Sequence, residues 1–267
     1  MVGIFWNYAS QNRFLDIIMN KLIELNSVEL TYPVYSVKAQ SLRNALANLS
    51  VGGRLLKSGS DILYIQALIG LTFSVDVGDR VGIIGHNGAG KTTLLKLIAG
   101  IYEPTSGRIA VNGKISSMID FTMGFDANMT GRENIVHIGR MRGLSTKFIQ
   151  SKMDEIIEFS ELGTFIDMPV KIFSSGMQSR LIFSVVTTLD PDIMLLDEWL
   201  SAGDADFVTK AQARINQLLD KSRCLILASH SFELIKSVCN KLLVLDGGKQ
   251  AYYGPIEGWN FETRSQR

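Results

Sequence analysis

Cysteine is scarce in this chain, with only Cys224 and Cys239 among 267 residues. The two do not have the close spacing of metal-binding cysteine pairs, and Cys224 opens an apolar run typical of a buried strand. Such sparse use of cysteine suits a reducing cytosol. The sequence therefore offers no cysteine-based metal site.

The chain also lacks an excess of charge of either sign. Its 27 lysines and arginines balance 26 acidic residues, which gives a net charge of +1 and an isoelectric point near 7.7. No surplus of positive charge is left for a dedicated nucleic-acid surface, so we expect no nucleic-acid partner. Nor does any apolar run approach the roughly 18 residues that span a bilayer. If the protein works at a membrane, another subunit must cross it.

Residues 1–18 are rich in aromatic residues but lack the continuous apolar stretch of a secretion signal. We expect them to be a poorly packed or disordered extension ahead of a single domain over 19–257, followed by a tail over 258–267. A hydrophobic content of 46% supports a substantial core in that domain. The sequence shows no internal repeat and no low-complexity tract.

One glycine-rich segment carries a recognisable chemical pattern. Residues 85–92, GHNGAGKT, match the P-loop pattern G-x-x-x-x-G-K-[ST] and lie between an apolar run (80–84) and a helix-like segment (94–98). In that context the backbone N–H groups turn towards phosphate oxygens at a helix N-terminus. Lys91 would reach the β- and γ-phosphates of ATP and Thr92 would bind Mg²⁺. The candidate nucleotide-binding set here is Gly85, His86, Asn87, Gly88, Ala89, Gly90, Lys91, Thr92 and Thr93.

Apolar periodicity predicts the elements around this loop. The chain alternates strand-like and helix-like segments, with two short, wholly apolar runs that are typical of parallel strands buried on both faces. The predicted elements are a strand over 21–35 that ends at Pro33, a short helix and flexible loop over 36–61, strands at 62–65 and 71–77, helical structure over 130–162, a helix over 181–189, and buried strands at 193–196 and 224–228.

Three further segments accompany the P-loop. Residues 192–198, DIMLLDE, are an apolar strand that ends in two carboxylates, a pattern that alone fits a solvated acidic loop equally well. Residues 173–178 read FSSGMQ, and residues 225–230 form an apolar strand that ends in His230. The four segments in this order resemble the Walker A, signature, Walker B and switch-histidine elements of the ATP-binding cassette (ABC) family.

The resemblance implies an α/β fold: a P-loop ABC ATPase cassette with a RecA-like parallel-sheet core, an antiparallel β subdomain and a helical subdomain over about 116–176. Two copies would close head to tail around ATP. The P-loop of one copy would face the signature residues Ser174, Ser175 and Gly176 of the other. The signature departs from the usual LSGGQ at Phe173, Ser175 and Met177.

The same resemblance assigns roles near the reacting phosphate. Glu198 would polarise the attacking water and His230 would contact it, so these two are the candidate catalytic residues. Asp197 would orient Mg²⁺ together with Thr92. Asp204 belongs to a segment (201–204) that resembles the D-loop at the dimer interface.

Two elements of the family fit less directly. Tyr32 is our candidate for the aromatic residue that stacks on adenine, with Tyr35 and Tyr64 as alternatives. The Q-loop glutamine is missing between residues 118 and 125, and Asp120 is the candidate for a metal-facing residue in its place.

Several stretches resemble one branch of the family, the ATP-binding subunits that export O-antigen and capsular or teichoic-type polymers. They are GHNGAGK (85–91), TGRENI (130–135) and DEWLSAGD (197–204). This resemblance implies an ATPase, peripheral on the cytoplasmic face of the bacterial inner membrane, that powers export of a lipid-linked polysaccharide through a separate permease. The alternatives are export of another cargo, such as a lipid or drug, or a soluble ABC ATPase outside transport. Few residues follow Asp246, so we expect no C-terminal carbohydrate-binding domain.

Overall fold

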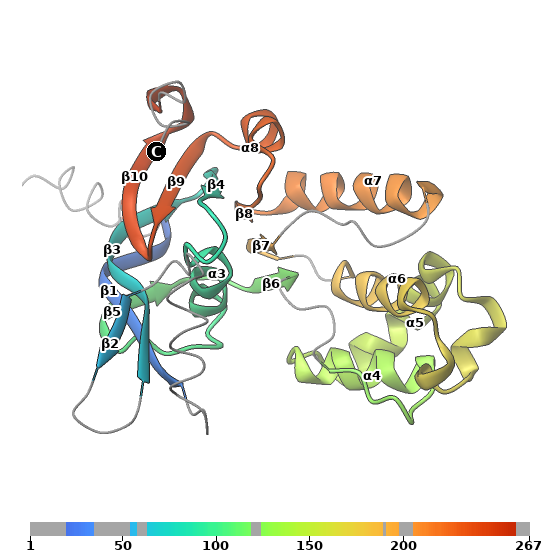
Figure 1. Cartoon of the computed structure of the whole chain (residues 1–267). Coiled ribbons are helices and arrows are strands. Elements are labelled where there is room, and N and C mark those ends of the chain that lie inside the picture. The colour runs from blue at the N-terminus through green and yellow to red at the C-terminus, as the bar shows by residue number, and fades with distance from the viewer. Residues whose placement is uncertain are drawn as a thin grey trace, which may run out of the picture. The chain divides into compact units, whose positions relative to one another are not determined.

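The computed structural model describes residues 20–34, 54–57, 63–118, 124–188, 191–197 and 205–259. The chain divides into two compact units (Figure 1). The first comprises Met1–Gly113 with Arg223–Arg267, and the second comprises Lys114–Ser222. The predicted extension over 1–18 and the predicted short helix after Tyr35 lie outside the described residues.

Antiparallel strands make up one part of the first unit. β1 (Lys21–Val34) pairs with β3 (Leu63–Asp76) on one side and with β5 (Ser106–Val111) on the other. β2 (Arg54–Lys57) also pairs with β3, so the flexible loop predicted over this segment is wrong there. The backbone of Leu55 and its neighbours pairs with β3. The glycine and serine residues around this segment favour a loop, but they carry no information about pairing with another strand.

Pro33 does not end β1 as predicted. It pairs with Tyr64, and the ladder with β3 continues to Val34. The pairing of β1 with β5 stops at Glu29, so among the described residues this end of β1 has β3 as its one neighbour. A proline is tolerated in such an edge segment because its missing N–H can face the unpaired side.

Parallel strands make up the other part of the first unit. β4 (Arg80–Ile84) lies between β8 (Cys224–Ala228) and β9 (Lys241–Asp246), parallel to both. Every residue of β8 is buried, which confirms the predicted buried parallel strand. β10 (Lys249–Pro255) runs antiparallel to β9 and touches β3, giving the order β5-β1-β3-β10-β9-β4-β8 (Figure 1).

Two short helices pack against this sheet. α3 (Lys91–Ile98) packs against β3 and β8, and α8 (Phe232–Val238) packs against β4. A Cβ on Gly82 of β4 would lie 2.3 Å from Ile235 Cγ2, so the approach of α8 requires glycine at that position. Both cysteines are buried and free, and burial raises the pKa of Cys239 to about 12. A short 3₁₀ helix, η3 (Ile256–Gly258), follows β10.

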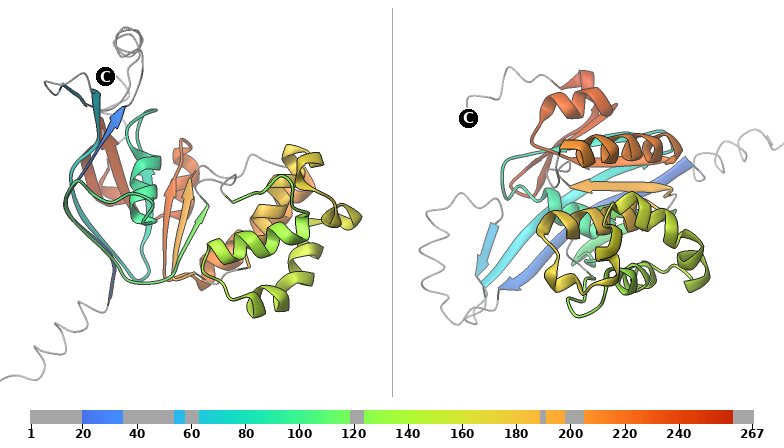
Figure 2. Two further views of the ribbon diagram at one scale, coloured as in Figure 1. Left: turned by 90° about the horizontal axis from the view of Figure 1, so that it is seen from below. Right: turned by 90° about the vertical axis from the view of Figure 1, so that its right-hand side faces the viewer.

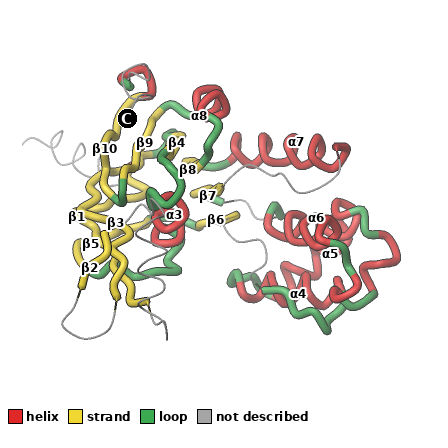
Figure 3. Tube along the Cα trace, viewed as in Figure 1, coloured by secondary structure: helices red, strands yellow, loops and turns green. Residues whose placement is uncertain are grey.

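Helices dominate the second unit. Its strands β6 (Ile115–Met118) and β7 (Ile193–Asp197) are parallel. Its helices, red in Figure 3, are α4 (Gly131–Met141), α5 (Thr146–Ser160), α6 (Ser175–Val186) and α7 (Ala205–Lys221), with 3₁₀ turns η1 (Gly163–Asp167) and η2 (Val170–Ile172). The predicted helical structure over 130–162 is confirmed. α4, α5 and α6 pack together as one cluster (Figure 2).

The starts of these helices follow from their capping residues. Thr130 and Glu133 form a reciprocal capping box at α4, and the Ser145 hydroxyl caps α5. The predicted helix over 181–189 is present but begins earlier, at Ser175, because the Ser174 hydroxyl accepts a hydrogen bond from Met177 N.

An aromatic and ionic cluster joins three helices of this unit. The rings of Phe159, Phe183 and Phe207 lie within 6.0 Å of one another by centroid distance. The cations Arg180, Lys210 and Arg214 lie over these rings. Arg180 and Lys210 form ion pairs with Glu161, the residue after α5, and Arg214 pairs with Glu155 of α5. Hydrogen bonds from Lys152 and Arg214 lower the pKa of Glu155. Within the described ranges, no helix is both long enough and apolar enough to cross a membrane.

Candidate nucleotide site

The P-loop connects β4 to α3 in the first unit. His86, Asn87 and Gly88 form its exposed crest, whereas Ala89, Gly90 and Lys91 are buried. Gly88 has φ 78° and Gly90 has φ 103°, both in the left-handed region that favours glycine. The glycines of the motif thus give the backbone the turn that a phosphate-binding loop requires.

The N-terminus of α3 differs from those of α4, α5, α6 and α8. α4, α5, α6 and α8 each have a side chain that caps their first turn, but Gly90 at the start of α3 provides none. The first N–H groups of a helix have no partner within the helix and carry a partial positive charge. An anionic group such as the phosphates of ATP fits this end of α3.

Lys91 occupies the interior of the loop. Its exposed fraction is only 8%, and its Nζ donates hydrogen bonds to Gly85 O at 2.8 Å and His86 O at 3.3 Å. These carbonyls hold the ammonium group against the loop, where it can exchange them for phosphate oxygens. Thr92 is exposed and Thr93 is partly exposed at the start of α3.

The turn between β9 and β10 packs against the P-loop and forms a wall beside it. Gly248 N donates to Ala89 O at 3.1 Å, and Gly248 O accepts from Ile69 N at 2.8 Å. The packing is tight: a Cβ on Gly248 would lie 2.5 Å from Ala67 O, and one on Gly90 would lie 2.9 Å from the same oxygen. Sequence reasoning missed this wall, for which the Gly-Gly pair at 247–248 was the one local signal.

His86 links the crest of the loop to the same turn. Its Nδ1 lies 2.8 Å from Asn87 O and its Nε2 lies 3.4 Å from Asp246 Oδ1. Both side chains are substantially exposed, so this contact contributes little to stability.

His230 leaves the sheet at the same edge as the P-loop. β4 and β8 are parallel with Ile83 opposite Ala228, so Gly85 and His230 both follow the carboxyl ends of neighbouring strands. The backbone there is fixed because Ser229 N donates to Ile83 O and Ser231 N donates to Ser229 Oγ. The His230 side chain is exposed. In open α/β sheets, ligands bind at this edge.

Tyr32 lies on β1 opposite Ile65 of β3, close to the Ala67–Leu68 segment that borders the P-loop. Its ring stacks on Tyr102, with centroids 6.5 Å apart and an interplanar angle of 25°. Partial burial and the neighbouring Tyr102 raise the pKa of Tyr32. The alternative Tyr64 lies on β3, opposite Pro33 of β1, whereas Tyr35 lies outside the described residues.

Asp197 and the signature residues belong to the second unit. Asp197 is the last residue of β7 and is partly exposed. Ser174 is the N-cap of α6, and Ser175 and Gly176 form its first turn. A hydroxyl that accepts a hydrogen bond from Met177 N can still donate to a phosphate oxygen. Asp120, Glu198 and Asp204 lie outside the described residues.

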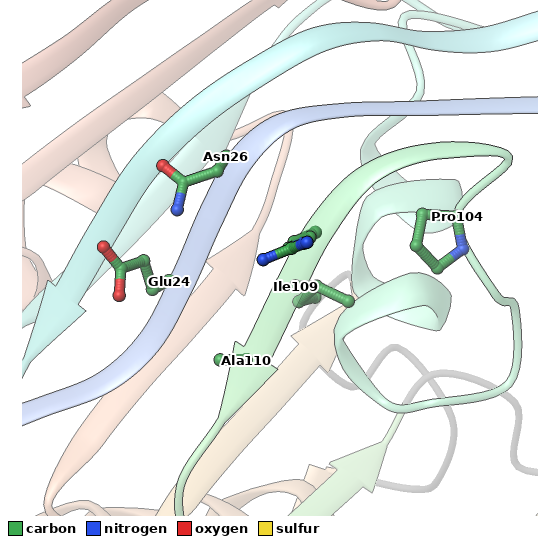
Figure 4. A pocket seen from close by; sticks show the side chains of 6 residues that line it. Glu24, Asn26, Pro104, Ile109 and Ala110 are labelled. Atoms are coloured by element: carbon green, nitrogen blue, oxygen red, sulfur yellow. The ribbon is translucent and has the colours of Figure 1, made fainter.

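The described residues contain no group of three or more potential metal-ligating side chains. Mg²⁺ in nucleotide sites is usually held by one or two carboxylates, water and the phosphates themselves. The predicted donors Thr92 and Asp197 fit that chemistry. A pocket of about 430 Å³ lies elsewhere, over the paired strands β1 and β5, and is lined by Glu24, Asn26, Pro104, Arg108, Ile109 and Ala110 (Figure 4). None of the predicted site residues belongs to it.

Comparisons with known proteins identify the family of this chain. The model of the ABC transporter family matches residues 68–201. The O-antigen export system ATP-binding protein RfbE of Yersinia enterocolitica is 42% identical over 86% of this chain and 96% of its own length. The teichoic acids export ATP-binding protein TagH of Lactococcus lactis is 46% identical over 88% of this chain, which spans about half (49%) of that relative.

Solved structures confirm the predicted fold. The ATP-binding subunit of an ABC transporter is 20% identical with a TM-score of 0.65, over 88% of this chain and 90% of that one. A dimeric ATP-binding cassette bound to ADP and phosphate is 18% identical with a TM-score of 0.64, over 89% of this chain and 100% of that one. The predictions of an ABC-type ATPase and of its likeness to polysaccharide-export proteins are confirmed. The chain belongs to the ABC transporter family, among the relatives of the ATP-binding proteins of O-antigen and teichoic acid export.

Proposed function

We propose that this protein hydrolyses ATP to power export of a lipid-linked polysaccharide, such as O-antigen, across the cytoplasmic membrane. The observation that carries the proposal is its 42% identity to an O-antigen export ATP-binding protein over 96% of that protein's length. The P-loop and the uncapped start of α3 support ATP as the energy source, because both suit a bound triphosphate.

Each site residue has a proposed role in this reaction. Lys91 and the P-loop amides bind the β- and γ-phosphates, and Thr92 and Asp197 are the residues that would hold Mg²⁺, which would neutralise charge on the phosphates. Glu198 accepts a proton from the attacking water, and His230 orients that water. Tyr32 stacks on the adenine ring. Asp120 and Asp204 are proposed to complete the site, as the sequence resemblance implies.

The proposed partners are a second copy of this chain and a membrane-spanning permease. Ser174, Ser175 and Gly176 at the start of α6 would bind the γ-phosphate held by the other copy, since a helix N-terminus favours an anion. ATP binding then favours the closed pair and hydrolysis releases it, which moves the permease. The protein is proposed to lie peripherally on the cytoplasmic face of the bacterial inner membrane.

Replacing Lys91 with alanine in the chromosomal copy tests the exported cargo. We expect one surface polysaccharide to disappear while its lipid-linked form accumulates inside the cell, because the ATP-driven step precedes surface display. Surface glycans are measured by gel electrophoresis and lipid-linked precursors by mass spectrometry of membrane extracts. Lys249→Ala, an exposed charge change on β10, is the matched control and leaves both unchanged.

Normal surface glycans in cells that contain the stable Lys91→Ala protein would contradict polysaccharide export. Accumulation of a lipid or a drug in those cells would instead favour the alternative cargo. The Yersinia relative argues against that alternative, because its name specifies O-antigen export.

A further inference from the structure

Asn134 is a fully buried polar side chain in the first turns of α4, with an exposed fraction of 0%. Its Nδ2 lies 3.0 Å from Asp126 O, 3.2 Å from Met129 O and 3.0 Å from Thr130 O. Its Oδ1 accepts a hydrogen bond from Asp126 N at 2.9 Å. The Asn134 side chain therefore bonds to the backbone at both ends of the 126–130 loop. Removing these hydrogen bonds would leave buried polar groups unpaired, which costs free energy of folding.

That loop runs beside the segment that leads to the signature. Thr130 and Pro169 form an antiparallel bridge. Val170 N donates to Met129 O and Lys171 N donates to Ala127 O, both at 2.9 Å, and Gly131 N donates to Met168 O at 3.2 Å. The exposed pair Arg132–Asp167, at 2.8 Å, lies at the end of this ladder. The position of residues 168–171 is thus set by the loop that Asn134 holds.

Phe173 connects residues 168–171 to Ser174 and is itself held in place. Phe173 N donates to Val170 O at 2.9 Å, and its ring is buried with an exposed fraction of 6%. A Cβ on Gly131 would lie 3.2 Å from Phe173 Cζ and 2.9 Å from Ile166 O, so α4 and the residue before Ser174 are in close contact. Ser174 follows directly as the N-cap of α6.

We propose that Asn134 is a positioning residue for Ser174: through the 126–130 loop and its ladder to residues 168–171, it fixes where the N-terminus of α6 presents the signature. This inference rests on the proposed function, in which Ser174 binds the nucleotide held by a second copy. Asn134 itself lies fully buried at the start of α4 and acts only through the backbone. All of these contacts lie within the second unit, whereas the P-loop belongs to the first, so we expect ATP binding by the P-loop to be retained when they are lost.

Asn134→Asp and Asn134→Ala in the full-length protein test this role. Aspartate keeps the size of the side chain but removes the amide that bonds three carbonyls. We expect ATP affinity within about twofold of wild type and turnover lower by roughly tenfold or more, since small displacements of a positioned group cost up to about 10²-fold. ATP-dependent dimer formation, measured by analytical ultracentrifugation in the Glu198→Gln background, is expected to fall in parallel.

The matched control is Asn128→Ala, an exposed residue of the same loop, which keeps wild-type turnover. Wild-type turnover and dimerisation in folded Asn134 variants would overturn the proposal, as would an equal loss of ATP affinity and turnover. If neither variant folds, Gly131→Ala decides, because its methyl group would crowd both Ile166 O, at 2.9 Å, and Phe173 Cζ, at 3.2 Å. Wild-type turnover in that variant overturns the proposal.

Ser174→Ala separates this inference from the proposed function. Reduced turnover in Ser174→Ala with normal turnover in the Asn134 variants would refute the positioning role alone. Normal turnover in Ser174→Ala would refute the role of the signature on which both depend. The expected pattern is that Ser174→Ala and Asn134→Asp share the same defect, with ATP affinity retained and turnover lost.

Discussion

Replacing Glu198 with glutamine is expected to lower ATP turnover roughly 10²- to 10⁴-fold, which is the usual contribution of a positioned acid or base. Glutamine has nearly the same size but cannot accept the proton of the attacking water. ATP affinity is expected to stay near wild type, because the phosphates are bound by Lys91 and the P-loop amides. Phosphate release measures turnover, and calorimetric titration measures ATP affinity.

Glu257→Gln, the same change at an exposed residue of η3, is the matched control and keeps wild-type turnover. Because hydrolysis releases the closed pair in the proposed cycle, Glu198→Gln is expected to accumulate as an ATP-bound dimer. Turnover that is unchanged in Glu198→Gln would remove this residue from the role of general base.

Gly248→Ala is expected to weaken ATP binding roughly 10- to 100-fold. The new Cβ would lie 2.5 Å from Ala67 O, and Gly248 itself bonds to Ala89 of the P-loop. To relieve the contact, the turn must move and the loop must move with it. Loss of even one hydrogen bond to a charged phosphate, at about 1.5–3 kcal/mol, accounts for that change in affinity.

Gly247→Ala is the matched control for this experiment. Gly247 also has a positive φ, 54°, but a Cβ there meets no described atom within 4 Å. Both variants therefore carry the left-handed strain of about 1–2 kcal/mol, which lowers the melting temperature, but only Gly248→Ala disturbs the P-loop. Titration with a fluorescent ATP analogue compares them. Equal affinities in the two variants would show that the turn does not support the loop.

The P-loop and its flanking elements could be predicted from sequence because their signals are local. The apolar run of β4, the glycines of 85–90 and the amphipathic start of α3 are contiguous, and each has a direct backbone reason. The buried strand β8 was predictable for the same reason, since all its residues are apolar.

Features that depend on distant contacts could not be predicted. The wall of the P-loop joins Ala89 to Gly248, and the pairing of β2 depends on β3, which a local pattern does not encode. Pro33 was expected to end β1 because an interior strand excludes proline. The strand tolerates it because, among the described strands, only β3 pairs with β1 beyond Glu29.

Asn134 illustrates the same limit within a motif. Asparagine is a poor helix former, and its usual place is a cap or turn, so its position in α4 gave no hint of a buried role. Its four contacts depend on how the preceding loop folds back over the helix. The stretch 130–135 resembles relatives in sequence, but the physical purpose of its asparagine emerges only in the folded chain.

ATP-driven movement of a lipid-linked polysaccharide is the central claim, and inside-out membrane vesicles from the source cell test it most directly. ATP is added outside, and the fraction of glycan that becomes protected from an added glycosidase is measured. The account predicts that protection rises with ATP in vesicles carrying the wild-type protein and does not rise in vesicles carrying Glu198→Gln. Equal protection in both, or protection that is independent of ATP, would contradict it.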